Sequence, residues 1–206
     1  MDKKVIIGMV SVASMVILGA CGNGNTNETT TNTDNQTLSS SKVSTSDNSS
    51  TSSLLSQEFE VTLDDAIGLF KTEHPDVAIT SIEFDKNFGA YGYKIEGVDD
   101  TKEYELFIDA YTSEISKKRE ENIDSEDGDG AARRNDALVL DNIISPQKAM
   151  EIAFSEVSEQ GDVTEWKLNQ EIQSTFYEVT IRNGRNDSEI KIDSVSGTIL
   201  ETEQDD

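Results

Sequence analysis

An internal repeat constrains the fold of this 206-residue chain more than any other feature of its sequence. Residues 61–67 match residues 144–150 at an offset of 83. Three later segments match at an offset of 84: 82–84 with 166–168, 93–95 with 177–179, and 106–109 with 190–193. One inserted residue accounts for the change of offset. A match sustained over such a length predicts two copies of one supersecondary unit.

Each copy opens with a segment whose ends predict a helix. In the first copy Thr62 is a good N-cap, and Pro75 is expected to end the helix near His74. In the second copy Ser145 caps the helix, and Gly161 is expected to end it. Apolar residues recur at helical spacing between these limits, so each helix has one face to bury.

The rest of each copy is predicted to form strands. Residues 91–95 alternate apolar with small or polar side chains, and 103–111 and 189–195 are rich in β-formers. A helix must bury its apolar stripe, and an antiparallel meander offers one apolar face. The expected fold class is α+β: two small repeats, each a helix packed on an antiparallel β-meander, after a disordered tether. Trp166 is expected in the core of the second repeat.

Composition sets the predicted domain limits. Residues 21–57 are dominated by Ser, Thr, Asn and Gly and hold too few apolar side chains for a core, which predicts a disordered tether. The first repeat is expected over residues 58–121, an acidic linker over 122–142, and the second repeat over 143–206.

Residues 1–20 are predicted to be an export leader. Two lysines precede an uncharged, largely apolar segment, 5–17, that is too short to span a membrane stably. The leader ends in Leu-Gly-Ala-Cys at 18–21, which resembles the lipobox of bacterial lipoproteins. The resemblance implies signal cleavage between Ala20 and Cys21, lipidation of Cys21, and attachment to the outer, extracellular face of the cell membrane. The alternative is an ordinary signal peptide followed by a free thiol.

The repeated pattern resembles a known family. A capped helix containing Ala66 or Ala149, a Tyr-x-Ile/Val strand, and a long strand that ends in Asp before a turn into Ile are similar to the PepSY domain. Residues 193–199 fit the closing turn of that family, whereas the first copy has Ser113 where glycine is usual. Serine there predicts either a left-handed turn strained by about 1–2 kcal/mol or a different turn. The resemblance implies an extracellular peptidase as partner, since PepSY modules occur in metallopeptidase propeptides and are thought to restrain peptidases.

The residue inventory does not favour an enzyme. His74 is the only histidine, and its position before Pro75 suits a helix end. The sequence has no His-Glu-x-x-His zinc motif, and lipidation would occupy the only cysteine, Cys21. No catalytic residue, metal ligand or cofactor is predicted.

The net charge limits the classes of molecule that this protein can bind. The chain carries 41 acidic and 17 basic residues, a net charge of −24, which excludes nucleic acid and leaves the lipidated Cys21 as the contact with the membrane. The acidic residues 124–129 do not fit an EF-hand loop, because Asp129 stands where that loop needs glycine. They form either a solvated linker or a weak site for Ca²⁺ or Mg²⁺.

These features favour a lipid-anchored extracellular binding module that restrains a secreted peptidase. No peptidase follows the second copy before Asp206, so restraint would act in trans. The partner would bind either to a sheet edge or to an acidic face. The alternative is a structural or weakly cation-binding protein of the cell envelope without a peptidase partner.

Overall fold

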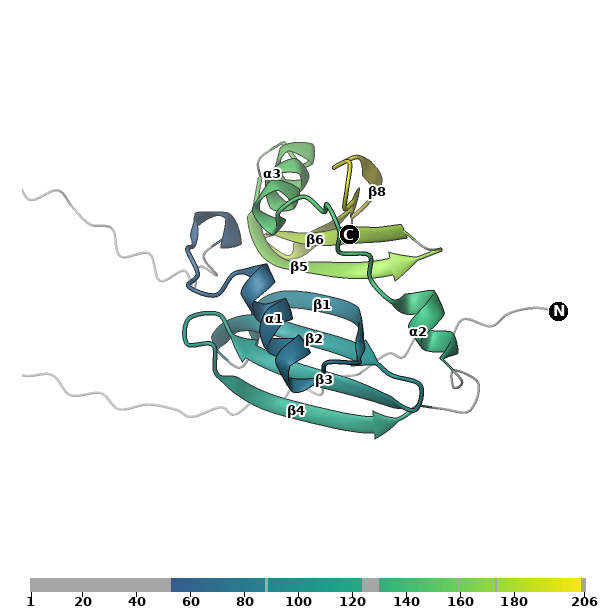
Figure 1. The fold of residues 1–206 in the computed structure, drawn as a ribbon. Helices are drawn as coiled ribbons and strands as arrows, with labels where there is room; N and C mark the ends of the chain where they lie inside the picture. Colours follow the sequence, from purple (N-terminus) through teal and green to yellow (C-terminus); the bar gives the residue numbers. More distant parts are fainter. Residues whose placement is uncertain (1–52, 88, 124–129, 159, 173, 205–206) are drawn as a thin grey trace, which may run out of the picture. The chain divides into compact units, whose positions relative to one another are not determined.

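Two helix-and-strand sets succeed one another along the chain (Figure 1). The computed structural model describes residues 53–204 except 88, 124–129, 159 and 173. The first set is η1 (Leu54–Ser56), α1 (Leu63–Glu73), β1 (Ala78–Asn87), β2 (Ala90–Val98), β3 (Lys102–Asp109) and β4 (Ile115–Asn122). The second set is α2 (Ala131–Asp136), α3 (Pro146–Glu156), β5 (Asp162–Glu171), β6 (Ser174–Asn183), β7 (Asn186–Asp193) and β8 (Ile199–Gln204).

All eight strands belong to one antiparallel sheet in the order β4-β3-β2-β1-β5-β6-β7-β8. Four strands from each half follow one another as neighbours, and the halves meet where β1 pairs with β5. The pairs there are Ile82 with Leu168, Glu83 with Lys167, and Phe84 with Trp166. The prediction of an α+β fold built on antiparallel strands is therefore confirmed.

Both long helices begin where the sequence predicts. The Thr62 hydroxyl accepts a hydrogen bond from the Asp65 N–H at 3.2 Å, and the Asp65 carboxylate accepts one from the Thr62 N–H at 3.1 Å, which together make a capping box. Helix α1 ends at Glu73 with His74 as its C-cap, as expected. At the start of α3 the Ser145 hydroxyl accepts from the Lys148 N–H at 3.2 Å.

The predicted end of the second helix at Gly161 is wrong. Helix α3 stops at Glu156, because Ser158 takes a positive φ of 58° and its N–H bonds to Ser155 rather than continuing the helix. Gly161 lies instead just before β5 with a φ of 102°. A Cβ atom at Gly161 would lie 2.6 Å from the Arg182 carbonyl oxygen, so the close strand pairing there requires glycine.

The core lies on one face of the sheet, beneath α1 and α3. Residues of both helices and of all the inner strands join one buried cluster. Trp166 is 2% exposed and stacks on Phe84 at a centroid distance of 5.7 Å, which confirms its predicted place in the core. Leu54, which falls in the range predicted as tether, is 1% exposed in the same cluster. Residues 53–57 thus pack against the folded part.

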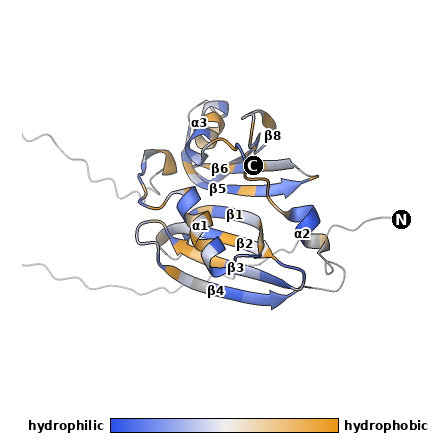
Figure 2. Cartoon of the chain, viewed as in Figure 1, coloured by the Kyte–Doolittle hydropathy of each residue, from blue (hydrophilic) through white to orange (hydrophobic). Residues whose placement is uncertain are grey.

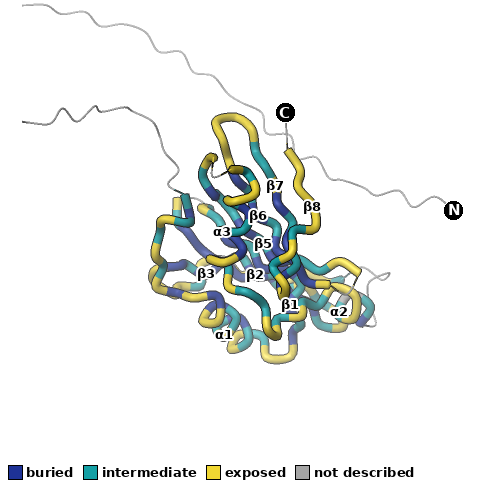
Figure 3. The backbone as a smooth tube through the Cα atoms, turned by 90° about the horizontal axis from the view of Figure 1, so that it is seen from above, coloured by how far each residue is buried: buried dark blue, intermediate teal, exposed yellow. Residues whose placement is uncertain are grey.

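The two edge strands are charged and exposed. β4 carries Arg119, Glu120 and Glu121, and Figure 2 shows much of this strand in hydrophilic colours. β8 carries Glu201 and Glu203, and Figure 3 shows it exposed beside the buried inner strands. Charged side chains on an edge discourage further strand pairing.

Candidate functional site

The sheet has a second face, opposite α1 and α3, that is rich in carboxylates. Residues directly opposite each other in an antiparallel ladder share a face, so the register assigns each side chain. The acidic residues at these positions are Glu83, Asp85, Glu96, Glu103, Glu105, Asp109, Glu121, Asp162, Glu165, Glu171, Glu178, Asp187, Glu189, Asp193, Glu201 and Glu203. The basic ones described there are Lys94, Arg119, Lys167, Arg182 and Lys191. This surface is called the acidic face below.

Three carboxylates meet at the centre of the acidic face, where β1 pairs with β5. Oxygens of Glu83, Asp85 and Glu165 lie within 4.8 Å of one another, and this group is called the carboxylate trio. Lys94 Nζ contacts the Glu83 carboxylate at 2.6 Å and partly balances the charge. The Oδ1 atom of Asp85 is buried without a hydrogen-bond partner.

Burial and mutual repulsion perturb two members of the trio. Partial burial, followed by the charges of Glu83 and Asp85, raises the pKa of Glu165 to about 7. Partial burial and the charge of Glu83 also raise the pKa of Asp85, although Lys94 opposes the shift. The trio therefore gains a proton more readily than solvated carboxylates do.

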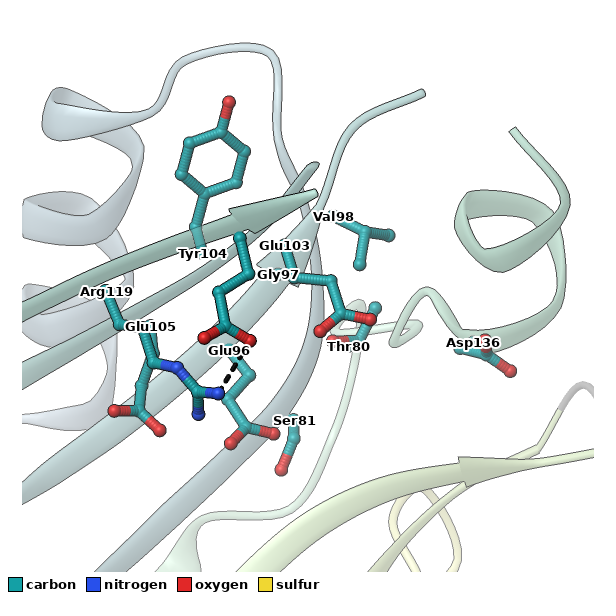
Figure 4. Close-up of a pocket in the computed structure, with 11 residues that line it drawn as sticks. Thr80, Ser81, Glu96, Gly97, Val98, Glu103, Tyr104, Glu105, Arg119 and Asp136 are labelled. Carbon is teal, nitrogen blue, oxygen red and sulfur yellow. Dashed lines mark hydrogen bonds and ion pairs between the residues drawn. The ribbon is translucent and has the colours of Figure 1, made fainter. Parts of the chain in front are cut away.

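A cavity of about 330 Å³ opens beside the trio, over β1 to β4 (Figure 4). Its acidic lining residues are Glu96, Glu103, Glu105, Glu121 and Asp136. Arg119 also lines it, and Arg119 Nη2 pairs with the Glu121 carboxylate at 2.6 Å. The other lining residues are Thr80, Ser81, Gly97, Val98 and Tyr104. This space is called the acidic cavity below.

The acidic cavity is formed by cross-strand neighbours, beside an irregularity of the β1–β2 ladder between Ile79 and Ser81. Ser81 stands opposite Glu96 across the β1–β2 ladder, and Glu96 stands opposite Glu105 across the β2–β3 ladder. The β3–β4 ladder places Arg119 opposite Glu105. These cross-strand neighbours project from one side of the sheet, so their head groups converge on the same space.

The residues singled out in the sequence analysis are not among those of the trio or the acidic cavity. Ala20 and Cys21 lie outside the described residues, as does the acidic segment 124–129, so their predicted roles stay predictions. The centroid of the His74 ring lies 4.4 Å from that of the Tyr104 ring, on the helix-covered side of the sheet. This agrees with the interpretation of His74 as a structural residue at a helix end. Among the described residues, no helix is long and apolar enough to cross a membrane.

Sequence reasoning did not single out the trio or the cavity. The carboxylates of the trio come from strands some 80 residues apart, and only the β1–β5 register brings them together. The available signal was the alternation of charged with apolar residues along 82–86 and 163–168, which marks one polar face on each strand.

Fold and site together define a class: a small α+β domain with its two long helices on one sheet face and a charged face opposite that these helices leave uncovered. The family model for the peptidase propeptide and YPEB domain, PepSY, matches residues 60–119 and 143–203. The chain belongs to the PepSY family, and the resemblance seen in the sequence is confirmed. The family takes its description from a propeptide module rather than a catalytic one.

A solved structure agrees with this assignment. A presumed lipoprotein from Clostridium difficile 630, known from a crystal structure, is 39% identical to this chain in sequence. The two structures superpose with a TM-score of 0.71. The match covers 74% of this chain and 99% of that protein. Among curated proteins, no match to this chain was found.

Proposed function

We propose that this protein is a lipid-anchored extracellular binding module that restrains a secreted peptidase in trans. The observation that carries the proposal is the pair of PepSY matches, because the family includes peptidase propeptides. The similarity to a presumed lipoprotein supports the anchor at Cys21. Anchoring holds the module near the membrane surface, where its effective concentration against secreted partners is raised.

The acidic face is the proposed contact surface. The edge strands β4 and β8 are charged, so strand addition at an edge is disfavoured. The acidic face is broad and largely free of α1 and α3, and its excess of carboxylates suits a basic surface on the partner. Steering of this kind raises the association rate and weakens as salt increases.

We also propose that the two halves are copies of one helix-and-meander unit joined through β1 and β5. Adding the offset of 84 to Glu83 gives 167, and Glu83 pairs with Lys167 in the structure. Ile82 pairs with Leu168, and Phe84 pairs with Trp166, as a two-fold axis through the Glu83–Lys167 pair requires. One continuous face, built from both halves, is thereby presented to a partner.

The proposal is tested by titrating the chain from residue 22 onward against the secreted peptidases of its own cells. Binding and peptidase activity are measured at low and high salt. A double charge reversal on the acidic face, Glu103→Lys with Glu178→Lys, is expected to weaken binding by about tenfold or more. The control, Glu60→Lys with Glu156→Lys, changes the net charge equally at exposed sites off this face and leaves binding within about twofold.

The alternative function is weak binding of Ca²⁺ or Mg²⁺ in the cell envelope, and the carboxylate trio is the observation that favours it. Three carboxylates supply oxygen ligands of the kind these ions prefer, although the Lys94–Glu83 ion pair competes. Calorimetric titration with calcium, repeated on Asp85→Asn, tests this function. If calcium binds at about millimolar concentration and no peptidase binds or slows, the alternative replaces the peptidase proposal.

A further inference from the structure

We propose that the acidic cavity binds a single lysine or arginine side chain presented by the partner protein. This inference rests on the proposed function and names the chemistry that the acidic face recognises. It concerns the part of the face formed by β1 to β4, where the side chains enclose a space rather than a flat surface.

The charge of the lining calls for a cation. Five carboxylates line the cavity, those of Glu96, Glu103, Glu105, Glu121 and Asp136. Arg119 lines the cavity, and its guanidinium already pairs with Glu121. Lys94 Nζ, which binds Glu83 of the trio, also lies 3.7 Å from the Glu96 carboxylate, so two basic groups face five carboxylates. The Glu96, Glu103 and Glu105 carboxylates in Figure 4 lie around the same space. A cationic head group placed among them would relieve the repulsion between like charges.

A buried hydroxyl is a second, independent observation that points to a ligand. Ser81 is 6% exposed, and its Oγ atom has no hydrogen-bond partner. In Figure 4 it lies beside Glu96 among the cavity residues. A buried polar atom without a partner costs about 1–3 kcal/mol, so such atoms are uncommon unless a ligand or water satisfies them. A lysine ammonium or an arginine guanidinium donates N–H groups that a serine oxygen and neighbouring carboxylates accept together.

Size and charge type favour a side chain over other ligands. A volume of about 330 Å³ lies at the low end of the roughly 300–1,000 Å³ range of small-molecule sites. The guanidinium of Arg119 disfavours a divalent ion, which concentrates two charges at one point, more than it disfavours a delocalised or flexible monovalent group. A long side chain can also enter from one end and leave its backbone outside.

The second half of the chain lacks this arrangement. At the offset of 84, Glu165 stands for Ser81 and Thr180 stands for Glu96. Asp187 stands for Glu103, and Arg182 already holds it through two hydrogen bonds of 2.8 and 2.6 Å. Apart from Asp136 of α2, the cavity residues therefore belong to the first half, and the second half supplies an internal comparison.

The test uses three blocked tripeptides, acetyl-Gly-Xaa-Gly-amide, in which Xaa is arginine, lysine or the neutral isostere citrulline. Each is titrated into the isotopically labelled chain from residue 22 onward, and backbone amide shifts are followed by NMR. The arginine and lysine peptides are expected to move the amides of Ser81, Glu96 and Gly97, and the citrulline peptide is not. Shifts spread over the whole face, or equal shifts with citrulline, overturn the proposal.

Two matched variants separate a cavity from general electrostatics. Glu96→Gln with Glu103→Gln should weaken arginine-peptide binding by about tenfold, whereas Glu201→Gln with Glu203→Gln removes the same charge from β8 and should change it by less than about twofold. Equal weakening by both pairs contradicts the proposal. So does calcium at about 5 mM moving the three amides while no peptide does.

The cavity inference and the proposed peptidase function can fail independently of each other. If a peptidase binds the Glu96→Gln, Glu103→Gln variant as tightly as the original chain, the cavity inference fails while the proposed function stands. If the basic peptides bind the cavity and no peptidase binds, the proposed function fails and the cavity still recognises a basic side chain.

Discussion

At the residue scale, two turns in equivalent positions differ by one side chain. Asp109 closes the turn after β3, and Asp193 closes the turn after β7, each by accepting two backbone N–H hydrogen bonds. Ser113 has a φ of 63° where Gly197 has 71°. Of the two alternatives predicted for Ser113, a strained left-handed turn or a different turn, the structure has the left-handed turn, and serine adopts a conformation that suits glycine.

Exchanging these residues tests the strain. Ser113→Gly should stabilise the fold by about 0.5–1 kcal/mol, because relief of the left-handed strain exceeds the added flexibility of the unfolded chain. Gly197→Ser should destabilise it by about 1–2 kcal/mol, and more if Ile152 cannot move, since a new Cβ would lie 2.9 Å from the Ile152 Cδ1 atom. Urea unfolding measures both. A destabilised Ser113→Gly variant would show that serine is not strained there.

Glu165 gives the fold a pH dependence of predictable sign. Because its folded pKa of about 7 lies above the ordinary 4.5, the folded state holds the extra proton, and stability falls as pH rises from about 4.5 through 7. Glu165→Gln should therefore be more stable than the original chain at pH 8 by about 1–2 kcal/mol, after allowance for solvent screening, and nearly equal to it at pH 4. Melting temperatures across this range measure the effect. Exposed Glu201→Gln is the control, and a pH-independent difference would contradict the assignment.

The role of a residue can be predicted from the sequence where it depends on neighbours along the chain. It cannot be predicted where it depends on the register between distant strands. Thr62, Ser145 and Ser113 are readable because capping and turn chemistry depend on neighbours a few positions away. Trp166 is readable from alternation along its own strand. The carboxylate trio cannot be read from the sequence in this way. The pairing of β1 with β5 and its register depend on the packing of the whole core.

At the scale of elements, the β1–β5 pair is the junction of the two halves. Trp166 on β5 stacks on Phe84 of β1 and meets Tyr93 and Tyr177 edge-on at 6.1 and 5.9 Å. Its ring therefore packs against aromatic residues from both halves. The short elements η1 and α2 were not foreseen, since three- and six-residue helices leave no periodic pattern in a sequence.

Truncating this ring should weaken the junction as well as the core. Trp166→Ala is expected to destabilise the protein by about 3–5 kcal/mol, because a large buried ring leaves a cavity that its neighbours fill only in part. Chemical denaturation measures the loss. Phe107→Ala is the comparison variant, because it removes a buried ring on the acidic face, away from this junction. A shift of less than about 1 kcal/mol for Trp166→Ala would contradict a shared core.

At the scale of the whole molecule, the described residues fall within one compact unit although the chain matches the PepSY model twice. The predicted linker, residues 122–142, joins the halves covalently, while the β1–β5 ladder joins them through hydrogen bonds. A specific protease site placed within residues 124–129 should therefore yield two fragments that stay together in size-exclusion chromatography. Adding Trp166→Ala should let them separate at lower denaturant concentrations. Separation of the unaltered fragments in buffer would show that the halves are independent domains.

The predicted anchor at Cys21 sets where the proposed binding surface would meet a partner. Replacing Cys21 by alanine removes the predicted lipid attachment, and two acyl chains supply the free energy that holds a lipoprotein on a membrane. Cys21→Ala should therefore move the protein from the membrane fraction to the medium, or leave it with an uncut leader. Cell fractionation with immunoblotting follows its place, and Ser44→Ala, in the predicted tether, should leave it unchanged. Since the predicted tether separates residue 21 from the core residues, the melting temperature of any released protein should equal that of the unaltered folded part. Retention of correctly cut Cys21→Ala protein in the membrane would contradict lipidation, and confinement at the surface would then have to come from a protein partner.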